Sequence, residues 1–315
     1  MGVVWSVTTK TTNSGARLVG KTAVITGANT GIGKVTAKDF YQRGARVILA
    51  CRNLEKGLEA VDDIKRQCEG KQNLGQMELV KLDLSSLKSV RTCAKNLLQK
   101  EKQINLLINN AGVMMIPELT KTEDGYEMQF GTNHLGHFLF TLLLMPMFLQ
   151  STPVRIVNVS SRSHLLTFYL NIDDLNFEKR SYSPIGAYIQ SKLCNVLFTK
   201  ELAERLKENH VEGINVYSLH PGVINTNLKR HVNFPMKSYF KKFIKTPEEG
   251  ARTTIFCAVH EMCANETGLY YGNCKPSYVS HITRKKKVAK KLWDASLKMS
   301  GLNEHFNPFI SETKL

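Results

Sequence analysis

The sequence contains no run of about 18 apolar residues, the length at which a helix can cross a bilayer. Its best candidate, Phe138–Leu149, is too short and contains Pro146, so it predicts a buried helix instead. The first residues also lack the basic and apolar regions of a secretory signal peptide. We therefore expect no membrane span, no signal peptide and a protein that faces the cytosol.

Paired cysteine patterns are absent as well. The chain has seven cysteines, an odd number, scattered without the spacing of a metal site. This pattern indicates a reducing compartment and argues against a disulfide framework or a zinc site. The histidines, His220 among them, are not arranged for metal binding either, so we expect no metal site. We expect each cysteine to be a small core residue.

No linker rich in proline, serine and glycine divides the 315 residues, of which 42% are hydrophobic. Such a chain can bury a large core as one doubly wound domain or as two small ones, and the missing linker favours one. We expect an N-terminal tail over residues 1–19, one large domain over 20–275, and a basic C-terminal helix and tail over 276–315.

Positive charge is abundant, with a formal net charge of +16. The densest cluster comprises Arg284, Lys285, Lys286, Lys287, Lys290 and Lys291. Because no nucleic-acid motif accompanies it, we expect no nucleic-acid partner. The cluster predicts the solvated face of a terminal helix that ends near Leu292–Trp293, and a membrane surface is the alternative partner.

The N-terminus matches the Met-Gly-x-x-x-Ser pattern of N-myristoylation, with Gly2 as the acceptor and Ser6 in place. A disordered tail is the alternative interpretation. One acyl chain binds membranes only marginally, but a basic patch can supply the second signal. Peripheral contact with the endoplasmic reticulum or another membrane therefore stays open, as does a homodimer.

The stretch Lys21–Tyr41 predicts a strand, a glycine turn and a helix. Glycines let the backbone approach a pyrophosphate, and the N-terminus of the helix favours its charge. The spacing Gly-x3-Gly-x-Gly departs from the general Gly-x-Gly-x-x-Gly fingerprint, so a tight turn without a ligand is the alternative. The candidate cofactor residues here are Gly27, Ala28, Asn29, Thr30, Gly31, Ile32 and Gly33.

The second expected strand, Ala45–Ala50, runs into Cys51, Arg52 and Asn53. A dinucleotide fold usually presents an acidic residue to the ribose here, but this chain has none. Arginine can bind a 2′-phosphate bidentately, so Arg52 favours NADP(H) over NAD(H). A surface arginine is the alternative. The regular alternation of strands and helices predicts an α/β fold with a doubly wound, mostly parallel sheet of about seven strands and helices on both faces.

One ordered set of motifs resembles the short-chain dehydrogenase/reductase family, over roughly residues 20–275. The set is Thr26-Gly27-x3-Gly31-x-Gly33, Asp83-Leu84, Asn109-Asn110-Ala111-Gly112, Asn133-His134-Leu135-Gly136, Val157-Asn158-Val159-Ser160-Ser161, Tyr188-x3-Lys192 and Pro221-Gly222. Within the family the chain is most similar to the retinol dehydrogenases, through Gly27–Lys34, Ala50–Asn53, Asn109–Met114, Asp124–Phe130, Asn133–Phe138, Ser191–Leu193 and Leu219–Val223. Those relatives usually begin with an apolar anchor, and this chain does not.

Tyr188 and Lys192 lie four residues apart on an expected helix from about Pro184 to Lys207, so both side chains share one face. Ser161 ends the expected strand Arg155–Val159, which should bring it to the same edge of the sheet. A tyrosine pKa near 10 would fall beside an ammonium and a positive nicotinamide. We therefore expect Tyr188 to be the general acid/base.

The resemblance implies further roles. Lys192 would also hydrogen-bond the nicotinamide ribose, Ser161 rather than Ser160 would bind the substrate oxygen with Tyr188, and Asn133 would support the lysine through a water. A buried amide that satisfies local backbone is the alternative for Asn133. Further cofactor contacts are expected from Asp83, Leu84, Asn110, Ala111, Gly112, Pro221, Gly222, Val223 and Thr226.

Two segments are candidates for binding an apolar substrate. The family resemblance implies a mobile substrate loop over about 227–246, and a small helix pair is the alternative. Between Arg162 and Ser183, an apolar wall or ordinary loop packing could involve Phe168, Tyr169, Leu170, Leu175 and Phe177. The expected function is hydride transfer between NADP(H) and a lipophilic aldehyde or alcohol, retinal or retinol in the first place. The alternatives are a steroid or xenobiotic carbonyl reductase and a non-catalytic NADP(H)-binding scaffold.

Overall fold

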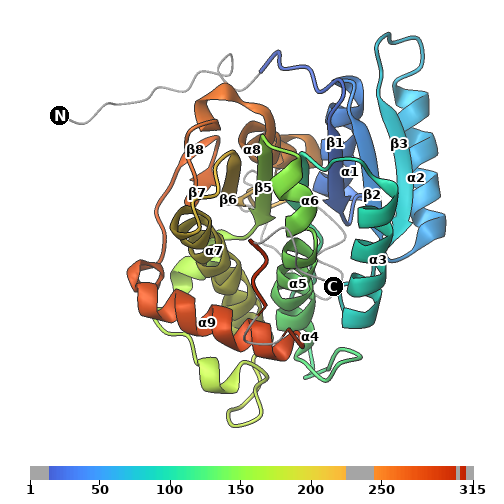
Figure 1. Ribbon diagram of the computed structural model, residues 1–315. Helices are drawn as coiled ribbons and strands as arrows, with labels where there is room; N and C mark the ends of the chain where they lie inside the picture. The colour runs from blue at the N-terminus through green and yellow to red at the C-terminus, as the bar shows by residue number, and fades with distance from the viewer. Residues whose placement is uncertain (1–13, 225–244, 303–305, 310–315) are drawn as a thin grey trace.

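A single sheet organises the protein. The structure, a computed structural model, describes residues 14–224, 245–302 and 306–309. Within these ranges eight strands pair in the order β3-β2-β1-β4-β5-β6-β7-β8, all parallel except β8, which is antiparallel to β7 (Figure 1). The strands are β1 (Thr22–Thr26), β2 (Arg46–Cys51), β3 (Gln76–Lys81), β4 (Leu106–Asn109), β5 (Val154–Val159), β6 (Ile214–His220), β7 (Leu269–Gly272) and β8 (Lys275–Pro276). The doubly wound α/β fold is confirmed.

The sheet has one strand more than expected. β8 has two residues and follows a turn in which Asn273 and Cys274 both have positive φ, 51° and 58°. Two consecutive positive φ angles make the kind of tight turn that joins antiparallel strands. A strand this short carries no periodic pattern that the sequence could reveal.

Helices cover both faces of the sheet. Residues of α1, α2 and α8 pack on one face, residues of α3, α5, α6 and α7 pack on the other, and α9 lies outside α7 (Figure 1). The helices are α1 (Gly31–Gln42), α2 (Leu54–Gln67), α3 (Leu87–Lys100), α4 (Met128–Phe130), α5 (Gly136–Leu143), α6 (Met145–Gln150), α7 (Pro184–Glu208), α8 (Pro247–Val259) and α9 (Lys286–Met299).

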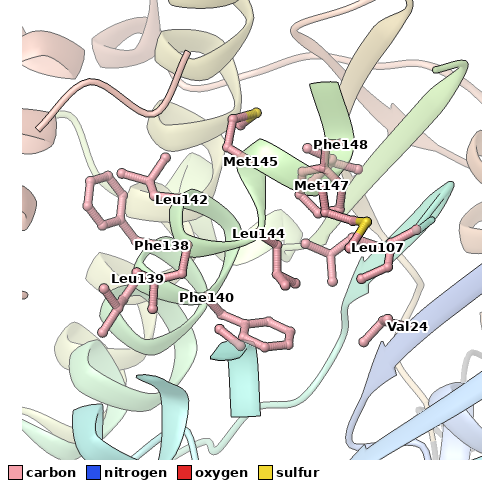
Figure 2. Close-up of a cluster of buried hydrophobic side chains, with 14 of the residues drawn as sticks. Val24, Leu107, Phe138, Leu139, Phe140, Leu142, Leu144, Met145, Met147 and Phe148 are labelled. Atoms are coloured by element: carbon pink, nitrogen blue, oxygen red, sulfur yellow. The ribbon is translucent and has the colours of Figure 1, made fainter. Parts of the chain in front are cut away.

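The uninterrupted apolar strands follow from this layering. Along β1, Ala23 and Ile25 belong to the cluster under α1 and α8, whereas Val24 belongs to the opposite cluster. Because successive side chains of a strand point to opposite faces, both sets must be apolar when both faces are buried. Figure 2 shows the second cluster, with Phe140 and Leu144 facing Val24 and Leu107.

The expected buried helix over Phe138–Leu149 is divided in two. α5 ends at Leu143 and α6 begins at Met145, with Pro146 in its first turn, where a missing N–H costs no hydrogen bond. The residues that lead into α5 depart from regular α-helical geometry and include Asn133. They form the π-helical segment η2 (Gly131–Leu135), a wide turn that is often found at functional sites.

The basic helix extends further than expected. α9 continues to Met299, so the prediction that it ends near Leu292–Trp293 is wrong. Both residues are buried in mid-helix, and the Trp293 ring packs edge-on against Phe138 at 5.1 Å between centroids. α9 therefore contributes to the core as well as to the surface.

All seven cysteines are free and buried, as expected for small core residues. None of the helices in the described ranges is long and apolar enough to cross a bilayer. The acylation motif at Gly2, the residue Thr226 and all but the last two residues of the expected substrate loop lie outside the described residues.

Candidate active site

A cleft opens where the direction of winding changes, between β1 and β4. At such a point the loops that follow the two strands diverge and leave a crevice at the carboxyl edge of the sheet. The cleft has a volume of about 560 Å³. The expected site residues that line it are Gly27, Asn29, Thr30, Gly31, Ile32, Arg52, Asn53, Asp83, Leu84, Asn110, Ala111, Gly112, Ser161, Tyr188, Lys192, Pro221, Gly222 and Val223.

Three expected residues lie behind the wall of the cleft. Ala28, Gly33 and Asn133 do not line it. A Cβ on Gly33 would stand 2.6 Å from the Gly27 carbonyl oxygen, so this glycine allows the turn and the helix to approach each other. Conversely, Lys56 and His220 line the cleft and were not predicted as ligand contacts, although Lys56 lies three residues after Asn53 and His220 directly precedes Pro221.

The glycine turn exposes backbone groups at the start of α1. Gly27 has φ of +65°, and a Cβ there would lie 2.9 Å from the Ala111 Cβ. α1 begins at Gly31 without a side-chain cap at Thr30 and without an acidic residue in its first turn. The free N–H groups and the positive end of the helix dipole therefore suit a pyrophosphate.

Two cationic residues line the cleft near the end of β2. Arg52 is exposed, and Lys56 follows in the first turn of α2. Asn53 caps α2, because its Oδ1 accepts the Lys56 N–H at 2.9 Å. The acidic residue that lines the described cleft is Asp83, and its Oδ1 accepts from the N–H and hydroxyl of Ser85. This end of the cleft therefore suits an additional phosphate.

Tyr188 and Lys192 rise from one face of α7, as expected. The Lys192 Nζ donates to the Val159 carbonyl at 3.0 Å and lies 5.8 Å from the centre of the Tyr188 ring. The lysine side chain is buried, and burial lowers its pKa to about 8. The ammonium is thus held between the end of β5 and the tyrosine.

Ser160 and Ser161 have different partners. The Ser160 hydroxyl is buried and donates to the Lys192 carbonyl at 2.7 Å. Ser161 caps the short 3-10 helix η3 (Arg162–Leu166), and its hydroxyl accepts the Ser163 N–H at 3.1 Å. The same hydroxyl is near enough to Tyr188 to lower the pKa of the phenol. Of the two serines, Ser161 is therefore the one placed beside the tyrosine.

The side chains alone do not lower the pKa of Tyr188. Burial raises it to about 12, and the neighbouring Ser161 hydroxyl opposes the rise only in part. Burial is the main cause of this pKa, and Lys192, whose ammonium donates to the Val159 carbonyl, is not among the causes. The lowering expected beside an ammonium and a positive nicotinamide stays a prediction. At neutral pH the Tyr188 phenol is protonated and can donate its proton.

The Asn133 amide is fully engaged. Its Nδ2 donates to the Val113 carbonyl and to the Ser191 hydroxyl, both at 2.9 Å, and its Oδ1 accepts the Val113 N–H at 2.8 Å. These contacts correspond to the buried-amide alternative and tie α7 to the loop after β4. The water-mediated relay stays a prediction.

The buried His137 connects the end of β1 with the loop that follows β4. The Thr26 Oγ1 accepts the N–H groups of Asn110 and Ala111, both at 2.9 Å, and lies 2.8 Å from the His137 Nε2. The His137 Nδ1 lies 3.0 Å from the Asn133 carbonyl oxygen, which can only accept. A proton on Nδ1 and none on Nε2 satisfies all four contacts. Burial lowers the His137 pKa to about 4, which keeps the ring neutral.

The expected apolar wall is not found in the segment after Ser161. Phe168 and Tyr169 are 78% and 67% exposed, whereas Leu170, Leu175 and Phe177 are buried. None of the five lines the cleft. Ordinary loop packing therefore describes the three buried residues, and the two aromatic residues face solvent.

Comparisons with known proteins agree with this geometry. A family model described as short chain dehydrogenase matches residues 21–172. The chain is 47% identical to Retinol dehydrogenase 11 of Mus musculus over 92% of this chain and 89% of the relative. It is 46% identical to Retinol dehydrogenase 12 of Homo sapiens, over 91% and 88% of the two chains.

Two solved structures are similar as well. One is an uncharacterized protein from Mycobacterium paratuberculosis, with 34% identity, a TM-score of 0.74 and coverage of 92% of this chain and 97% of that chain. The other is Pseudomonas aeruginosa RhlG in an active-site complex with NADP, with 25% identity, a TM-score of 0.64 and coverage of 81% and 94%. The similarity extends over most of the chain.

Proposed function

The chain belongs to the short-chain dehydrogenase/reductase family and is an oxidoreductase, and from this premise we propose that it transfers hydride between NADP(H) and a lipophilic aldehyde or alcohol, retinal or retinol in the first place. The observation that carries the proposal is that Ser161, Tyr188 and the buried Lys192 line one cleft, with the Lys192 Nζ 5.8 Å from the centre of the Tyr188 ring.

The residues present fit a nicotinamide dinucleotide. The glycine turn and the N-terminus of α1 would hold the pyrophosphate, and Arg52 with Lys56 would hold the 2′-phosphate. When bound, this cofactor supplies hydride to a carbonyl carbon or accepts it from an alcohol carbon. The similar RhlG structure contains NADP, which supports a phosphorylated cofactor here.

Side chains of the protein transfer the proton. In reduction, Ser161 donates a hydrogen bond to the substrate oxygen, and Tyr188 gives that oxygen its phenolic proton. In oxidation the same proton moves in the opposite direction. Because burial raises the pKa of Tyr188 to about 12, the phenol carries at neutral pH the proton that reduction requires. Lys192 stabilises the tyrosinate that remains after donation.

The substrate class follows from the apolar part of the cleft and from the relatives. Apolar lining residues include Leu84, Val113, Met114, Val223 and Ile224. Relatives at 46% and 47% identity are named retinol dehydrogenases. A long apolar chain with one terminal carbonyl suits a cleft in which the polar groups gather around Tyr188.

Steady-state turnover of the full chain tests the proposal. We expect all-trans retinal with NADPH to give the highest kcat/KM in a comparison with a medium-chain aldehyde and a steroid ketone, each measured with NADPH and NADH. Preference for the steroid ketone would contradict the substrate class, and preference for NADH would contradict the cofactor. No turnover of any carbonyl would contradict the catalytic assignment.

A further inference from the structure

Four large side chains project into solvent on one side of the protein. Leu166, Phe168, Tyr169 and Tyr278 are 71%, 78%, 67% and 88% exposed. Single exposed apolar residues are common, but a group of them rimmed by polar residues marks an interaction surface. We call these four side chains the aromatic patch.

Hydrogen bonds hold the two segments of the aromatic patch together. The Ser280 hydroxyl, which is buried, donates to the Thr167 carbonyl at 2.6 Å. The Thr167 hydroxyl in turn donates to the Tyr169 carbonyl at 2.8 Å, which shapes the loop locally. The aromatic side chains are therefore presented by a fixed backbone next to the turn that leads into α9.

The same turn leads into the strongest concentration of positive charge. Six basic residues and no acidic residue occur between Arg284 and Lys291, and all six are exposed. Within α9 the buried residues include Ala289, Leu292 and Trp293. Helical spacing puts Lys287 and Lys291 on the opposite face, with Lys298 farther along it. We call this exposed face, together with Arg284 and Lys285, the basic face.

Neighbouring acidic residues leave most of this charge uncompensated. Lys286 pairs with Glu204 of α7 at 2.6 Å, and Asp294 lies 3.8 Å from Arg205. In the described ranges no ion pair involves Lys287, Lys290 or Lys291. The face therefore carries net positive charge beside exposed aromatic rings.

We propose that the aromatic patch and the basic face together dock onto an anionic lipid surface. Lysines attract acidic headgroups, while aromatic and leucine side chains insert at the boundary between headgroups and acyl chains. A nucleic acid would also attract the lysines, but the rings and lysines lie on separate segments rather than alternating along one groove.

The position of this surface would allow a docked protein to take substrate from the lipid into the cleft. η3, which carries Leu166, begins directly after Ser161, so the aromatic patch adjoins the carboxyl edge of the sheet where the cleft opens. A docked protein would receive an apolar substrate from the lipid without passing it through water. The proposal goes beyond the reaction, since lipid binding can be measured whatever the substrate is.

Vesicle co-sedimentation of the full chain tests the proposal. We expect binding to phosphatidylcholine vesicles that contain phosphatidylserine and weak binding to phosphatidylcholine alone. Binding should be lost at high salt, because the Debye screening length shortens from about 10 Å at 0.1 M to about 3 Å at 1 M. A single-stranded oligonucleotide serves as the competing anion. Tighter binding of the oligonucleotide than of the anionic vesicles would overturn the proposal.

Three double variants locate the surface. Lysines near an anionic membrane are worth about fivefold each, so Lys287→Glu with Lys291→Glu should weaken vesicle binding by about 30-fold or more. Phe168→Ser with Tyr169→Ser should weaken it by about tenfold through lost apolar burial. The matched control Lys65→Glu with Lys71→Glu reverses two exposed charges near α2, at the other end of the sheet, and should bind normally.

Each outcome decides the proposal. Wild-type binding by either of the first two variants, or an equal loss in the α2 control, would overturn it. Turnover of a short water-soluble aldehyde should be unchanged in all three variants, and their thermal unfolding should match the wild type. If the wild type does not turn over this aldehyde, the proposed reaction is contradicted, whereas the vesicle result still stands.

Discussion

Protonation of His137 should destabilise the folded protein in mild acid. The ring accepts from the Thr26 hydroxyl and donates to the Asn133 carbonyl, so a second ring proton has no acceptor there. Burial lowers the His137 pKa from 6.5 to about 4. Above pH 6.5 the ring is neutral in both states. Between pH 6.5 and about 4 the unfolded chain binds a proton that the folded chain does not, so stability falls as the pH falls.

The magnitude follows from the two pKa values. Each pH unit between them is worth about 1.4 kcal/mol, so His137 alone should remove about 2 kcal/mol of unfolding free energy by pH 5 and about 3 kcal/mol in total. His134 and His220 act in the same direction, because burial lowers their pKa values to about 3 and about 4. The wild-type protein should thus lose stability steeply below pH 6.

Urea unfolding at pH 7.5 and pH 5 measures this effect. His137→Gln keeps an acceptor and a donor but cannot titrate in this range. We expect the variant to be less stable at pH 7.5, since its shape differs, and to lose about 2 kcal/mol less than the wild type between the two pH values. Equal losses in both proteins would refute the assignment of a neutral, buried His137.

Two further substitutions test the cofactor end of the cleft. Arg52→Asp should lower the ratio of kcat/KM for NADPH to that for NADH by about tenfold or more, because a charge-assisted phosphate contact becomes a repulsion; an unchanged ratio would place the 2′-phosphate elsewhere. Gly33→Ala should weaken NADPH binding and cost about 1–3 kcal/mol of unfolding free energy, because its Cβ would lie 2.6 Å from the Gly27 carbonyl. The control Gly15→Ala meets open space and should change stability by less than about 0.5 kcal/mol, and equal effects would contradict the packing argument.

The sequence predicted those parts of the protein that local patterns determine. α7 begins at Pro184 as expected and ends at Glu208, one residue beyond the expected end, because its N-terminal proline and its length give a clear signal. The strands expected over Ala45–Ala50 and Arg155–Val159 differ from β2 and β5 by no more than one residue at either end, since both of their faces are buried. The residues that follow these strands therefore meet where expected.

Features that depend on distant contacts were not predictable. Thr26 and His137 are 111 residues apart, and neither position by itself indicates that the two side chains meet. The π-helical turn around Asn133 contains residue types that also suit an α-helix, so only packing distinguishes the two. Phe168 and Tyr169 suggested burial by composition, but their exposure depends on how Ser280 holds the loop.

Replacement of the Tyr188 hydroxyl tests the central claim most directly. Tyr188→Phe should lower kcat for carbonyl reduction by about 10²-fold to 10⁴-fold, the usual contribution of a positioned acid, while the Kd for NADPH stays close to the wild-type value. The exposed Tyr278→Phe, measured with the same soluble aldehyde, is the matched control and should retain full turnover. Undiminished turnover in Tyr188→Phe, with normal cofactor binding, would contradict the account.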